Sequence, residues 1–453
     1  MQPLPKEFEE QMKRLLGEAG FFAYLDALNQ PYTRALRVNL LLRPDGTPPC
    51  PIEGLGAPVP WAKGAYFVEG DARPGLSPLH EGGLFYMQEP SALTAVTALD
   101  PQPGERVLDL CAAPGGKSTQ IAALMAGRGL LCCNEPIPSR AQILSRNIER
   151  MGVRNAVVLS AMPDALAPRF PAFFDRILVD APCSGEGMFR RQPEARDEWD
   201  ADAPRRCADR QMEILAQAAK MLRPGGTMVY STCTFNDTEN EGVLRRFLAL
   251  HPEFSLVPFA LPGLPEAKDG YLHLYPHEMR GEGHFVSRLK KADGADEADA
   301  PVQAAPQRKA PARAAAKGKA PAPIALPDVF SNAFAPERLY TAGDALWMLP
   351  EGISIERLSG LRVLRTGLLL AHAEGKRSEP DHALAMALRP EEAARTANLT
   401  QTQALAYQAG ETLSLGDLPG GYTLLCCEGV SLGWGKQAGG LMKNHYPKGL
   451  RRR

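Results

Sequence analysis

The stretch RVLDLCAAPGGKSTQIAALM, residues 106–125, decides the fold of this chain. It begins with an apolar run typical of a buried strand, continues through a loop with two adjacent glycines, and becomes helical from Lys117 to Met125. Glycine lets a backbone approach a ligand closely, and the free N–H groups at a helix start attract polar or negative groups. The stretch therefore predicts a strand–loop–helix unit with a ligand-binding loop at 111–117.

The segments that follow alternate between strand and helix in the same way. The predicted strands are 106–110, 129–135, 155–160, 175–180 and 227–232, with a late strand at 284–291, and the predicted helices after the first are 139–151, 206–222 and 237–250. This alternation predicts an α/β domain at 76–291, in which helices cover a mainly parallel sheet. In sheets of this kind, ligands bind at the carboxyl ends of the strands.

Composition divides the rest of the 453-residue chain. The pattern of apolar and polar residues predicts a small α/β domain at 1–75. A pattern typical of a folded domain occurs again at 326–453. Between them, residues 292–325 consist mainly of alanine, proline and basic side chains, which cannot bury a core, so we predict a linker there. The elements predicted in the two outer parts are a helix over Lys6–Leu16, a strand over Ala35–Leu42 and a hairpin over 422–436.

The composition also excludes several classes of protein. No window approaches about 18 uninterrupted apolar residues, so we expect no membrane span. The amino terminus lacks the apolar core of a signal peptide, so we expect a cytoplasmic protein with reduced cysteines. The nine cysteines include two adjacent pairs, Cys132-Cys133 and Cys426-Cys427, which we predict to pack inside strands, and no spacing predicts a metal site. A net charge of −1 restricts nucleic-acid binding to local basic patches.

The glycine loop does not match the common phosphate-binding patterns. A Walker A loop needs glycine where this chain has Cys111, and the GxGxxG dinucleotide pattern is absent. The second predicted strand ends at Glu135, about 20 residues after the loop, where an acid can accept hydrogen bonds from ribose hydroxyls. These features favour an adenosyl ligand that carries an amino acid, and S-adenosylmethionine fits. The structural alternative is a tight turn with a capping acid.

Two cysteines follow the ends of the fourth and fifth predicted strands. LVDAPCSGEGMFR (178–190) places Asp180 and Cys183 after strand four, and MLRPGGTMVYSTCTF (221–235) places Cys233 after strand five. If these strands are neighbours, the three side chains face one cleft beside the glycine loop. The alternative is a strand end with an inert cysteine, but two thiols and a carboxylate beside a cofactor loop favour catalysis.

Two thiols and one acid beside a methyl donor match the needs of methylation at carbon 5 of cytosine. A thiolate that adds to carbon 6 makes carbon 5 nucleophilic, and the proton on carbon 5 must leave before the thiol is eliminated. The reaction needs a nucleophile, a group that holds or protonates the base edge, and a group that assists release. Cys233, Asp180 and Cys183 can supply these roles, but their spacing does not decide which cysteine is the nucleophile.

Several motifs resemble the Sun (RsmF-like) family of S-adenosylmethionine-dependent RNA cytosine-5 methyltransferases. They are AAPGGK, DAPCSGEGMFR, PGGTMVYSTCTF with the following ENE, YMQEPSA at 86–92, GWGK, and the ending LMKNHYPKGLRRR. The resemblance covers nearly the whole chain. It implies a Rossmann-like class I methyltransferase domain at 76–291, an N-terminal RNA-binding α/β domain at 1–75 and a PUA-like RNA-binding module within 326–453. It also implies that Cys233 is the nucleophile and that Cys183 assists breakdown of the covalent intermediate.

The same resemblance implies a set of cofactor contacts. Glu135 would hold the ribose, and Asp180 would lie near both the methyl group and the target base. The family's acid after strand three is displaced here, because SAMPDAL offers either Asp164 as a substitute or Met162 in the usual place. The loop that would wrap the methionine and the sugar consists of Cys111, Ala112, Ala113, Pro114, Gly115, Gly116 and Lys117.

The implied substrate is small-subunit ribosomal RNA near the decoding region, or the small ribosomal subunit itself, bound by a monomer without a metal ion. The target cytosine must leave its stack to enter the pocket. Arg190, Arg191 and Arg196 are expected to contact phosphates or to be surface charges, and Arg34 and Arg37 are expected to be solvated. The basic end is expected either to contact RNA or to be solvated.

Three alternative functions stay open. The first is a cytosine-5 methyltransferase of transfer RNA, which would use the same catalytic motifs. The second is a ribosome-assembly RNA-binding protein, in which the C-terminal module would carry the main function. The third is amino-methylation of RNA or protein, which needs no pair of cysteines.

Overall fold

The computed structural model describes residues 3–294, 324, 328–330, 336–374 and 377–452. Most of the predicted linker at 292–325 lies outside the described residues. Among the helices that are described, none combines the length and the apolarity needed to cross a membrane.

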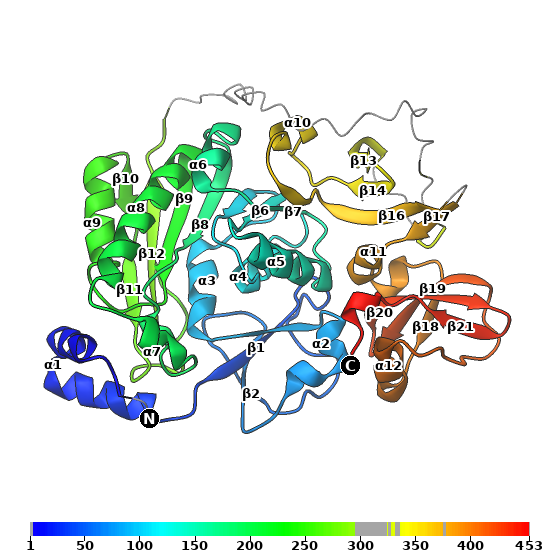
Figure 1. Cartoon of the computed structure of the whole chain (residues 1–453), viewed down its shortest axis with the longest axis horizontal. Coiled ribbons are helices and arrows are strands. Elements are labelled where there is room, and N and C mark those ends of the chain that lie inside the picture. The colour runs from blue at the N-terminus through cyan, green and yellow to red at the C-terminus, as the bar shows by residue number, and fades with distance from the viewer. Residues whose placement is uncertain (1–2, 295–323, 325–327, 331–335, 375–376, 453) are drawn as a thin grey trace.

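A nine-stranded sheet forms the centre of the molecule (Figure 1). Its strands are β5 (Arg106–Asp109), β6 (Leu130–Asn134), β7 (Ala156–Leu159), β8 (Phe174–Asp180), β9 (Leu222–Thr232), β10 (Phe254–Leu256), β11 (Tyr271–Leu274), β12 (His284–Lys291) and β15 (Val363–Arg365). Their order is β10-β12-β9-β8-β5-β6-β7-β15, with β11 paired to β12. The strands β5 to β9 pair in parallel, whereas β12 is antiparallel to β9. The predicted parallel α/β sheet is confirmed, and β8 and β9 are neighbours.

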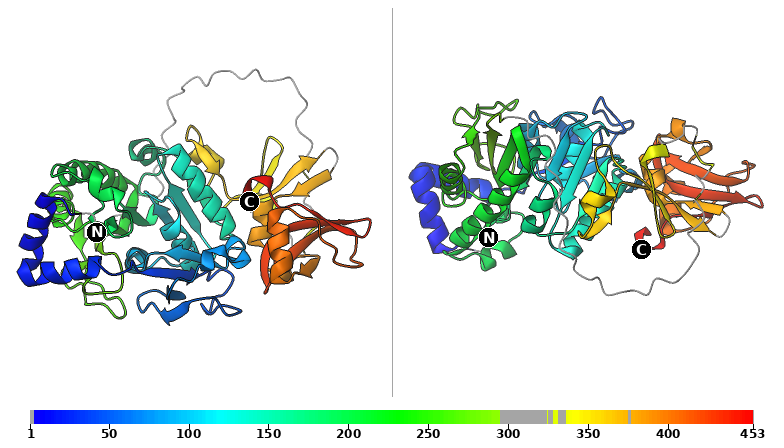
Figure 2. Two further views of the ribbon diagram at one scale, coloured as in Figure 1. Left: turned by 60° about the horizontal axis from the view of Figure 1, so that its bottom comes forward. Right: turned by 90° about the horizontal axis from the view of Figure 1, so that it is seen from above.

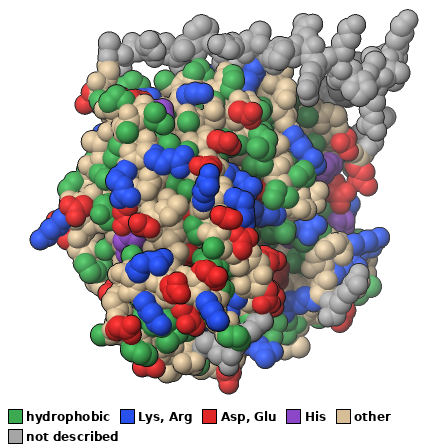
Figure 3. Space-filling model, turned by 60° about the vertical axis from the view of Figure 1, so that its left-hand side comes forward, with side chains coloured by type: hydrophobic (Ala, Val, Ile, Leu, Met, Phe, Trp, Pro, Cys, Tyr) green, Lys and Arg blue, Asp and Glu red, His purple; other side chains and the backbone are tan. Residues whose placement is uncertain are grey.

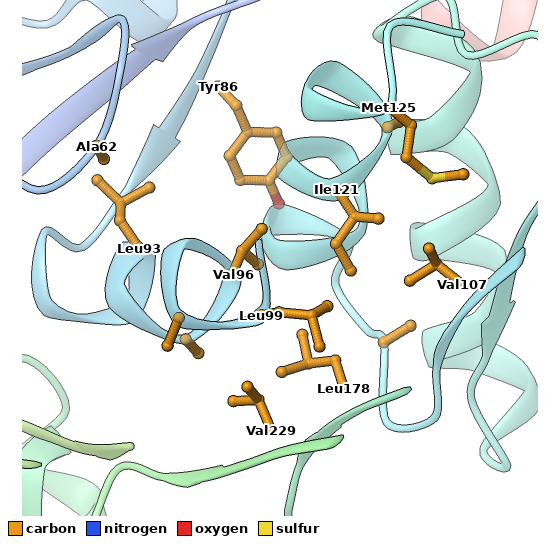
Figure 4. Close-up of a cluster of buried hydrophobic side chains, with 14 of the residues drawn as sticks. Ala62, Tyr86, Leu93, Val96, Leu99, Val107, Ile121, Met125, Leu178 and Val229 are labelled. Carbon is orange, nitrogen blue, oxygen red and sulfur yellow. The ribbon is translucent and has the colours of Figure 1, made fainter. Parts of the chain in front are cut away.

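Helices cover both faces of this sheet. They are α3 (Thr94–Leu99), α4 (Gly116–Leu124), α5 (Pro138–Arg150), α6 (Pro163–Leu166), α8 (Ala203–Met221) and α9 (Glu241–Leu250). The short helix α7 (Glu194–Glu198) instead contributes Ala195 to a separate apolar cluster. On one face, side chains of α3, α4 and α5 pack with those of the central strands; Figure 4 shows Val96, Ile121, Val107, Leu178 and Val229 in this cluster. On the other face, α8 and α9 bury a second apolar cluster. The sheet is therefore buried on both sides, which explains its almost continuously apolar strands.

The N-terminal part folds around a second sheet, in the order β2-β3-β1-β4. Its elements are α1 (Lys6–Leu28), β1 (Arg34–Val38), β2 (Leu55–Pro58), β3 (Ala65–Val68), α2 (Pro78–Glu81) and β4 (Phe85–Gln88). The sheet thus includes a strand beyond residue 75, the expected end of this domain. The first helix does not stop at Leu16: it bends at Gly17, whose φ is 69°, and continues because Phe21 and Tyr24 are buried in a further apolar cluster.

Two four-stranded sheets form the C-terminal part, which lies beside α5 and α2 (Figures 1 and 2). The first contains β13 (Leu339–Ala342), β14 (Ala345–Met348), β16 (Leu368–Glu374) and β17 (Arg377–Pro380), and the second contains β18 (Thr396–Asn398), β19 (Gly421–Cys427), β20 (Val430–Ala438) and β21 (Leu441–Asn444). Three helices, α10 (Ile355–Leu358), α11 (His382–Ala387) and α12 (Gln401–Ala409), complete it. The predicted hairpin is confirmed as β19–β20, and both adjacent cysteine pairs are buried in strands, as predicted.

Several arginines are not the solvated charges or phosphate contacts that the sequence indicates. Arg37 is buried and donates to Thr119 Oγ1 at 2.8 Å. Arg190 forms a buried ion pair with Glu282, and Arg196 is buried and donates to the Phe189 carbonyl. Arg37 and Arg190 thus connect elements that are distant in sequence, and only the tertiary structure reveals their partners.

The basic carboxyl end is also packed rather than free. Tyr446 is buried, and Arg452 donates to the carbonyls of Leu76 and Ser77 in the N-terminal part. The Tyr446 ring is therefore not available to stack on a base. The face in Figure 3 shows acidic and basic side chains interspersed, which agrees with the low net charge.

Candidate active site

The two predicted catalytic cysteines meet at the carboxyl edge of the sheet. Cys183 lies in the loop after β8 and Cys233 directly follows the end of β9, and because these strands pair in parallel their loops emerge side by side. The two Sγ atoms are 3.3 Å apart, and both cysteines are free and half-buried. The hydrogen bond with Cys233, together with burial, raises the pKa of Cys183 well above its usual range. The raised pKa favours the protonated form of the Cys183 thiol at neutral pH.

Asp180 ends β8 beside these thiols and is held as a carboxylate. Its Oδ2 accepts from Lys117 Nζ at 2.8 Å, and its Oδ1 accepts from Ser231 Oγ at 2.8 Å. The Nε2 atom of His284 lies 3.5 Å from Oδ1. Burial opposes ionisation of Asp180, but Lys117 and His284 outweigh it and hold the pKa of the carboxyl well below its usual range. Asp180 can therefore accept hydrogen bonds from a base edge, whereas protonating that edge is not a role for an ionised group.

Lys117 connects the predicted cofactor loop to the carboxylate of Asp180. Burial, the largest single cause, disfavours the charged form of Lys117, but the charge and the hydrogen bond of Asp180, with further negative charges nearby, together outweigh it and raise the pKa of Lys117. The loop ends at Gly115, whose φ of 113° is a conformation that favours glycine, and α4 begins at Gly116. Asn147 Nδ2 fixes the loop by donating to the Pro114 carbonyl at 2.9 Å. The first-turn N–H groups of α4 are thus positioned for a polar ligand.

Asp109, at the end of β5, has a buried oxygen without a partner among the described residues. Its Oδ2 accepts from Ser118 Oγ at 2.6 Å, whereas Oδ1 has no hydrogen bond within that part of the chain. Burial raises the pKa of this carboxyl to about 7. An unsatisfied acceptor under the glycine loop fits a bound group with polar hydrogens, such as the amino group of an amino-acid ligand.

The raised pKa of Asp109 makes its contribution to stability depend on pH. A carboxyl whose folded-state pKa lies above its unfolded value favours folding at low pH and loses that contribution as the pH rises to about 7. We expect Asp109→Asn, which cannot ionise, to gain about 2 kcal/mol in free energy of unfolding relative to wild type when the pH changes from about 5 to about 8. Urea denaturation of both proteins at the two pH values measures this gain. An equal difference at both values contradicts the expectation.

Glu135 and the candidate adenine-side residues follow the next two strands. Glu135 is buried after β6, and its Oε1 accepts from the Ile137 N–H at 3.0 Å while Oε2 lies 3.5 Å from Arg140. It shares the carboxyl edge with the loop, since Ala112 N–H donates to the carbonyl of Asn134. Asp164 and Met162 lie at the start of α6 with exposed side chains, and the Met162 carbonyl accepts from the N–H groups of Ala165 and Leu166. Burial raises the pKa of the Cys111 thiol, which favours its protonated form.

Two further residues beside Asp180 were not predicted from the sequence to belong to the site. Ser231 lies in β9 directly opposite Asp180, and His284 begins β12, on the other side of β9. Burial and then Lys117 lower the pKa of His284, so its imidazole is neutral. The antiparallel pairing of β12 with β9 brings His284 to the site, and no sequence pattern indicated that pairing.

The sequence matches four family descriptions in chain order. They are the N-terminal domain of 16S rRNA methyltransferase RsmF at residues 4–90, 16S rRNA methyltransferase RsmB/F at 96–290, the RsmF rRNA methyltransferase first C-terminal domain at 327–388 and the methyltransferase RsmF PUA domain at 394–452. Ribosomal RNA small subunit methyltransferase F of Erwinia tasmaniensis is 34% identical over 464 residues, which cover 98% of this chain and 96% of that protein. The chain belongs to the RsmB/F family of 16S rRNA methyltransferases.

Other relatives of this RsmB/F family member agree. The Klebsiella pneumoniae protein of the same name is 34% identical over 98% of this chain and 96% of its own length. A methyltransferase homologue protein from Pyrococcus horikoshii is 30% identical with a TM-score of 0.54, over 63% of this chain and 95% of that chain. NSun6 from the same organism, at 22% identity, shares the fold with a TM-score of 0.54 over 64% of this chain and 99% of its own. The expected class I methyltransferase fold and the PUA module are confirmed.

Proposed function

We propose that this protein is an RNA cytosine-5 methyltransferase that acts on 16S ribosomal RNA. The observation that carries the proposal is the pair of thiols, 3.3 Å apart, beside an ionised Asp180 and the glycine loop. Amino-methylation needs no such pair, and an RNA-binding assembly factor needs neither thiol.

The cofactor of the proposed reaction is S-adenosylmethionine, which supplies an electrophilic methyl group on a sulfonium centre. The loop from Cys111 to Lys117, with the N–H groups of α4, would hold its methionine part, and Glu135 would hold the ribose. Asp109 Oδ1 offers an unsatisfied acceptor under that loop. Asp164 or Met162 would border the adenine. Among the described residues, no cluster of His, Cys, Asp or Glu could hold a metal ion, and the proposed chemistry uses none.

The side chains around the thiols divide the proposed reaction between them. Cys233 Sγ, as thiolate, adds to carbon 6 of cytosine, and the electron pair of the carbon 5–carbon 6 double bond makes carbon 5 nucleophilic. Asp180 accepts hydrogen bonds from the exocyclic amino group and orients the ring. After methylation the proton on carbon 5 leaves to water, the double bond re-forms and the carbon 6–Sγ bond breaks. The Cys183 S–H then stabilises the departing Sγ of Cys233 by a hydrogen bond.

The proposed substrate is a cytosine near the decoding region of the small ribosomal subunit. The relatives are named as ribosomal RNA small subunit methyltransferases, and the PUA module and the N-terminal domain flank the methyltransferase domain as RNA-binding parts. The target base must be unstacked before it can reach Cys233. We propose that a monomer performs this reaction in the cytoplasm.

Transfer of tritiated methyl groups from S-adenosylmethionine tests the proposal. The substrates are 30S subunits and naked 16S RNA that lack the modification, with bulk transfer RNA in parallel, and bisulfite sequencing maps the product. We expect 5-methylcytosine at a decoding-region cytosine. Label in transfer RNA alone would keep the chemistry and overturn the substrate, and no label on any RNA despite cofactor binding would overturn the enzyme in favour of an RNA-binding protein.

A further inference from the structure

The loop that carries Cys183 contributes a buried carboxylate to the loop that carries Cys233. Glu186 is fully buried, and its Oε2 accepts from the backbone N–H groups of Phe235 and Asn236 at 2.8 and 3.1 Å. The Gly187 N–H also donates to the carbonyl of Cys233 at 2.8 Å. The backbone that follows the Cys233 side chain is thus fixed by residues that follow Cys183.

The loop after Cys233 contributes a second buried carboxylate in the opposite direction. Glu239 is fully buried. Its Oε2 accepts at 3.1 Å from the N–H of Ser184, the residue that directly follows Cys183. Gln211 Nε2 of α8 donates to Oε2 at 2.8 Å and also to the Pro182 carbonyl at 3.0 Å. Glu239, with Gln211, therefore fixes the backbone on both sides of Cys183.

Asn236 joins the two carboxylates into one network. Its Nδ2 lies 2.8 Å from Glu239 Oε1 and 3.0 Å from Glu186 Oε1, and its Oδ1 accepts from the Glu239 N–H at 2.8 Å. Each cysteine loop is therefore held by an acid that comes from the other. Networks of buried charge-assisted hydrogen bonds are rigid when every member is satisfied, and a missing acceptor displaces the donors that depend on it.

We propose that Glu239 is a positioning residue that holds the Cys183 thiol against Cys233 through the Ser184 N–H and thereby enables release of the methylated RNA. This inference rests on the proposed cytosine-5 reaction. The Glu239 carboxylate forms its hydrogen bonds with groups other than the two thiols. It acts on Cys183 through the neighbouring backbone. Both of its oxygens accept hydrogen bonds, so glutamine, which has one acceptor oxygen, must turn an NH₂ group toward a donor.

The charge of Glu239 also acts on the Cys183 thiol. The groups that face Glu239 from the surrounding elements are Glu186, Cys183, Cys207 of α8 and Tyr230 of β9. Burial raises the pKa of Glu239 to about 7, and its negative charge is one cause of the raised pKa of Cys183. Removing that charge is expected to let the Cys183 thiol ionise at lower pH, which a purely structural residue would not do.

The test compares E239Q with E239D, C183A and the control E213Q, which changes an exposed glutamate on α8. Each full-length protein is incubated with 16S RNA and S-adenosylmethionine, and covalent protein–RNA adducts are counted on denaturing gels. We expect E239Q to keep cofactor affinity but to lose turnover by about 100-fold, because a displaced catalytic group is costly, and to accumulate adduct as C183A does. E239D keeps both acceptor oxygens and is expected to restore part of the turnover.

A second measurement does not depend on RNA. The rate at which iodoacetamide alkylates Cys183, followed by mass spectrometry of its peptide across pH, is expected to shift to lower pH in E239Q and to stay unchanged in E213Q. An unchanged alkylation profile in E239Q, or adduct in C183A without adduct in E239Q, overturns the positioning role. A shifted profile with no adduct in any variant supports the positioning role and overturns the proposed reaction instead. If E239Q does not fold, E239D is measured against wild type: its shorter side chain is expected to lower turnover, and wild-type turnover in E239D then overturns the proposal.

Discussion

Cys233→Ala is expected to abolish methyl transfer to 16S RNA, with a loss of at least about 1,000-fold in turnover, because alanine cannot add to carbon 6 and carbon 5 then stays unreactive. Cofactor binding is expected to be unchanged, since the glycine loop and Glu135 lie after β5 and β6 rather than after β9. Tritium incorporation measures the first effect, and calorimetric titration with S-adenosylmethionine measures the second.

The matched control for this variant is Cys50→Ala. Cys50 is also a free, half-buried cysteine. It belongs to the N-terminal part, where it packs against the apolar cluster that contains Leu36 and Val38. We expect it to keep wild-type turnover. Methylation that persists in Cys233→Ala at more than a small fraction of the wild-type rate would rule out Cys233 as the nucleophile.

The strand-end argument brought Asp180 and the two cysteines together correctly, because it depends on a local pattern and one topological rule. The apolar runs before Asp180 and Cys233 predicted two strands, and the rule that ligands bind at the carboxyl edge placed both residues together. The structure confirms that β8 and β9 are neighbours, with Asp180 opposite Ser231. The glycine loop was located in the same way, because strand, loop and helix are contiguous in the sequence.

Features that depend on contacts between residues far apart in the chain could not be predicted from the sequence. Arg37 looked like a surface charge, yet it is buried because α4 supplies Thr119 and the Gly116 carbonyl as acceptors from about 80 residues away. His284 reaches Asp180 only through the pairing of β12 with β9. The edge strand β15 comes from beyond the predicted linker and pairs with β7, so the central sheet includes a strand from outside 76–291. Local patterns carry no information about such partners.

The two sulfur atoms lie 3.3 Å apart, within hydrogen-bond reach, and the hydrogen bond with Cys233, together with burial, raises the pKa of Cys183. A raised pKa favours an S–H group on Cys183. In the proposed reaction Cys183 keeps its proton and Cys233 attacks as the thiolate. These are the roles that the family resemblance implies, and they give the two alanine variants different expected phenotypes.

Cys183→Ala is expected to trap the enzyme on its RNA. The carbon 6–Sγ bond of Cys233 can still form, but the departing sulfur loses the S–H donor that stabilises it, so breakdown becomes slower than formation. We expect about one methyl group transferred per enzyme molecule, followed by a stall, and a labelled protein–RNA band that survives denaturing electrophoresis. The double variant Cys183→Ala/Cys233→Ala is the control and is expected to show no such band, because the nucleophile itself is missing.

If Cys183→Ala instead loses both label and adduct while Cys233→Ala forms an adduct, the roles of the two cysteines are exchanged. In that case Cys183 is the attacking thiol, and Asp180 and Lys117 would serve it instead of Cys233.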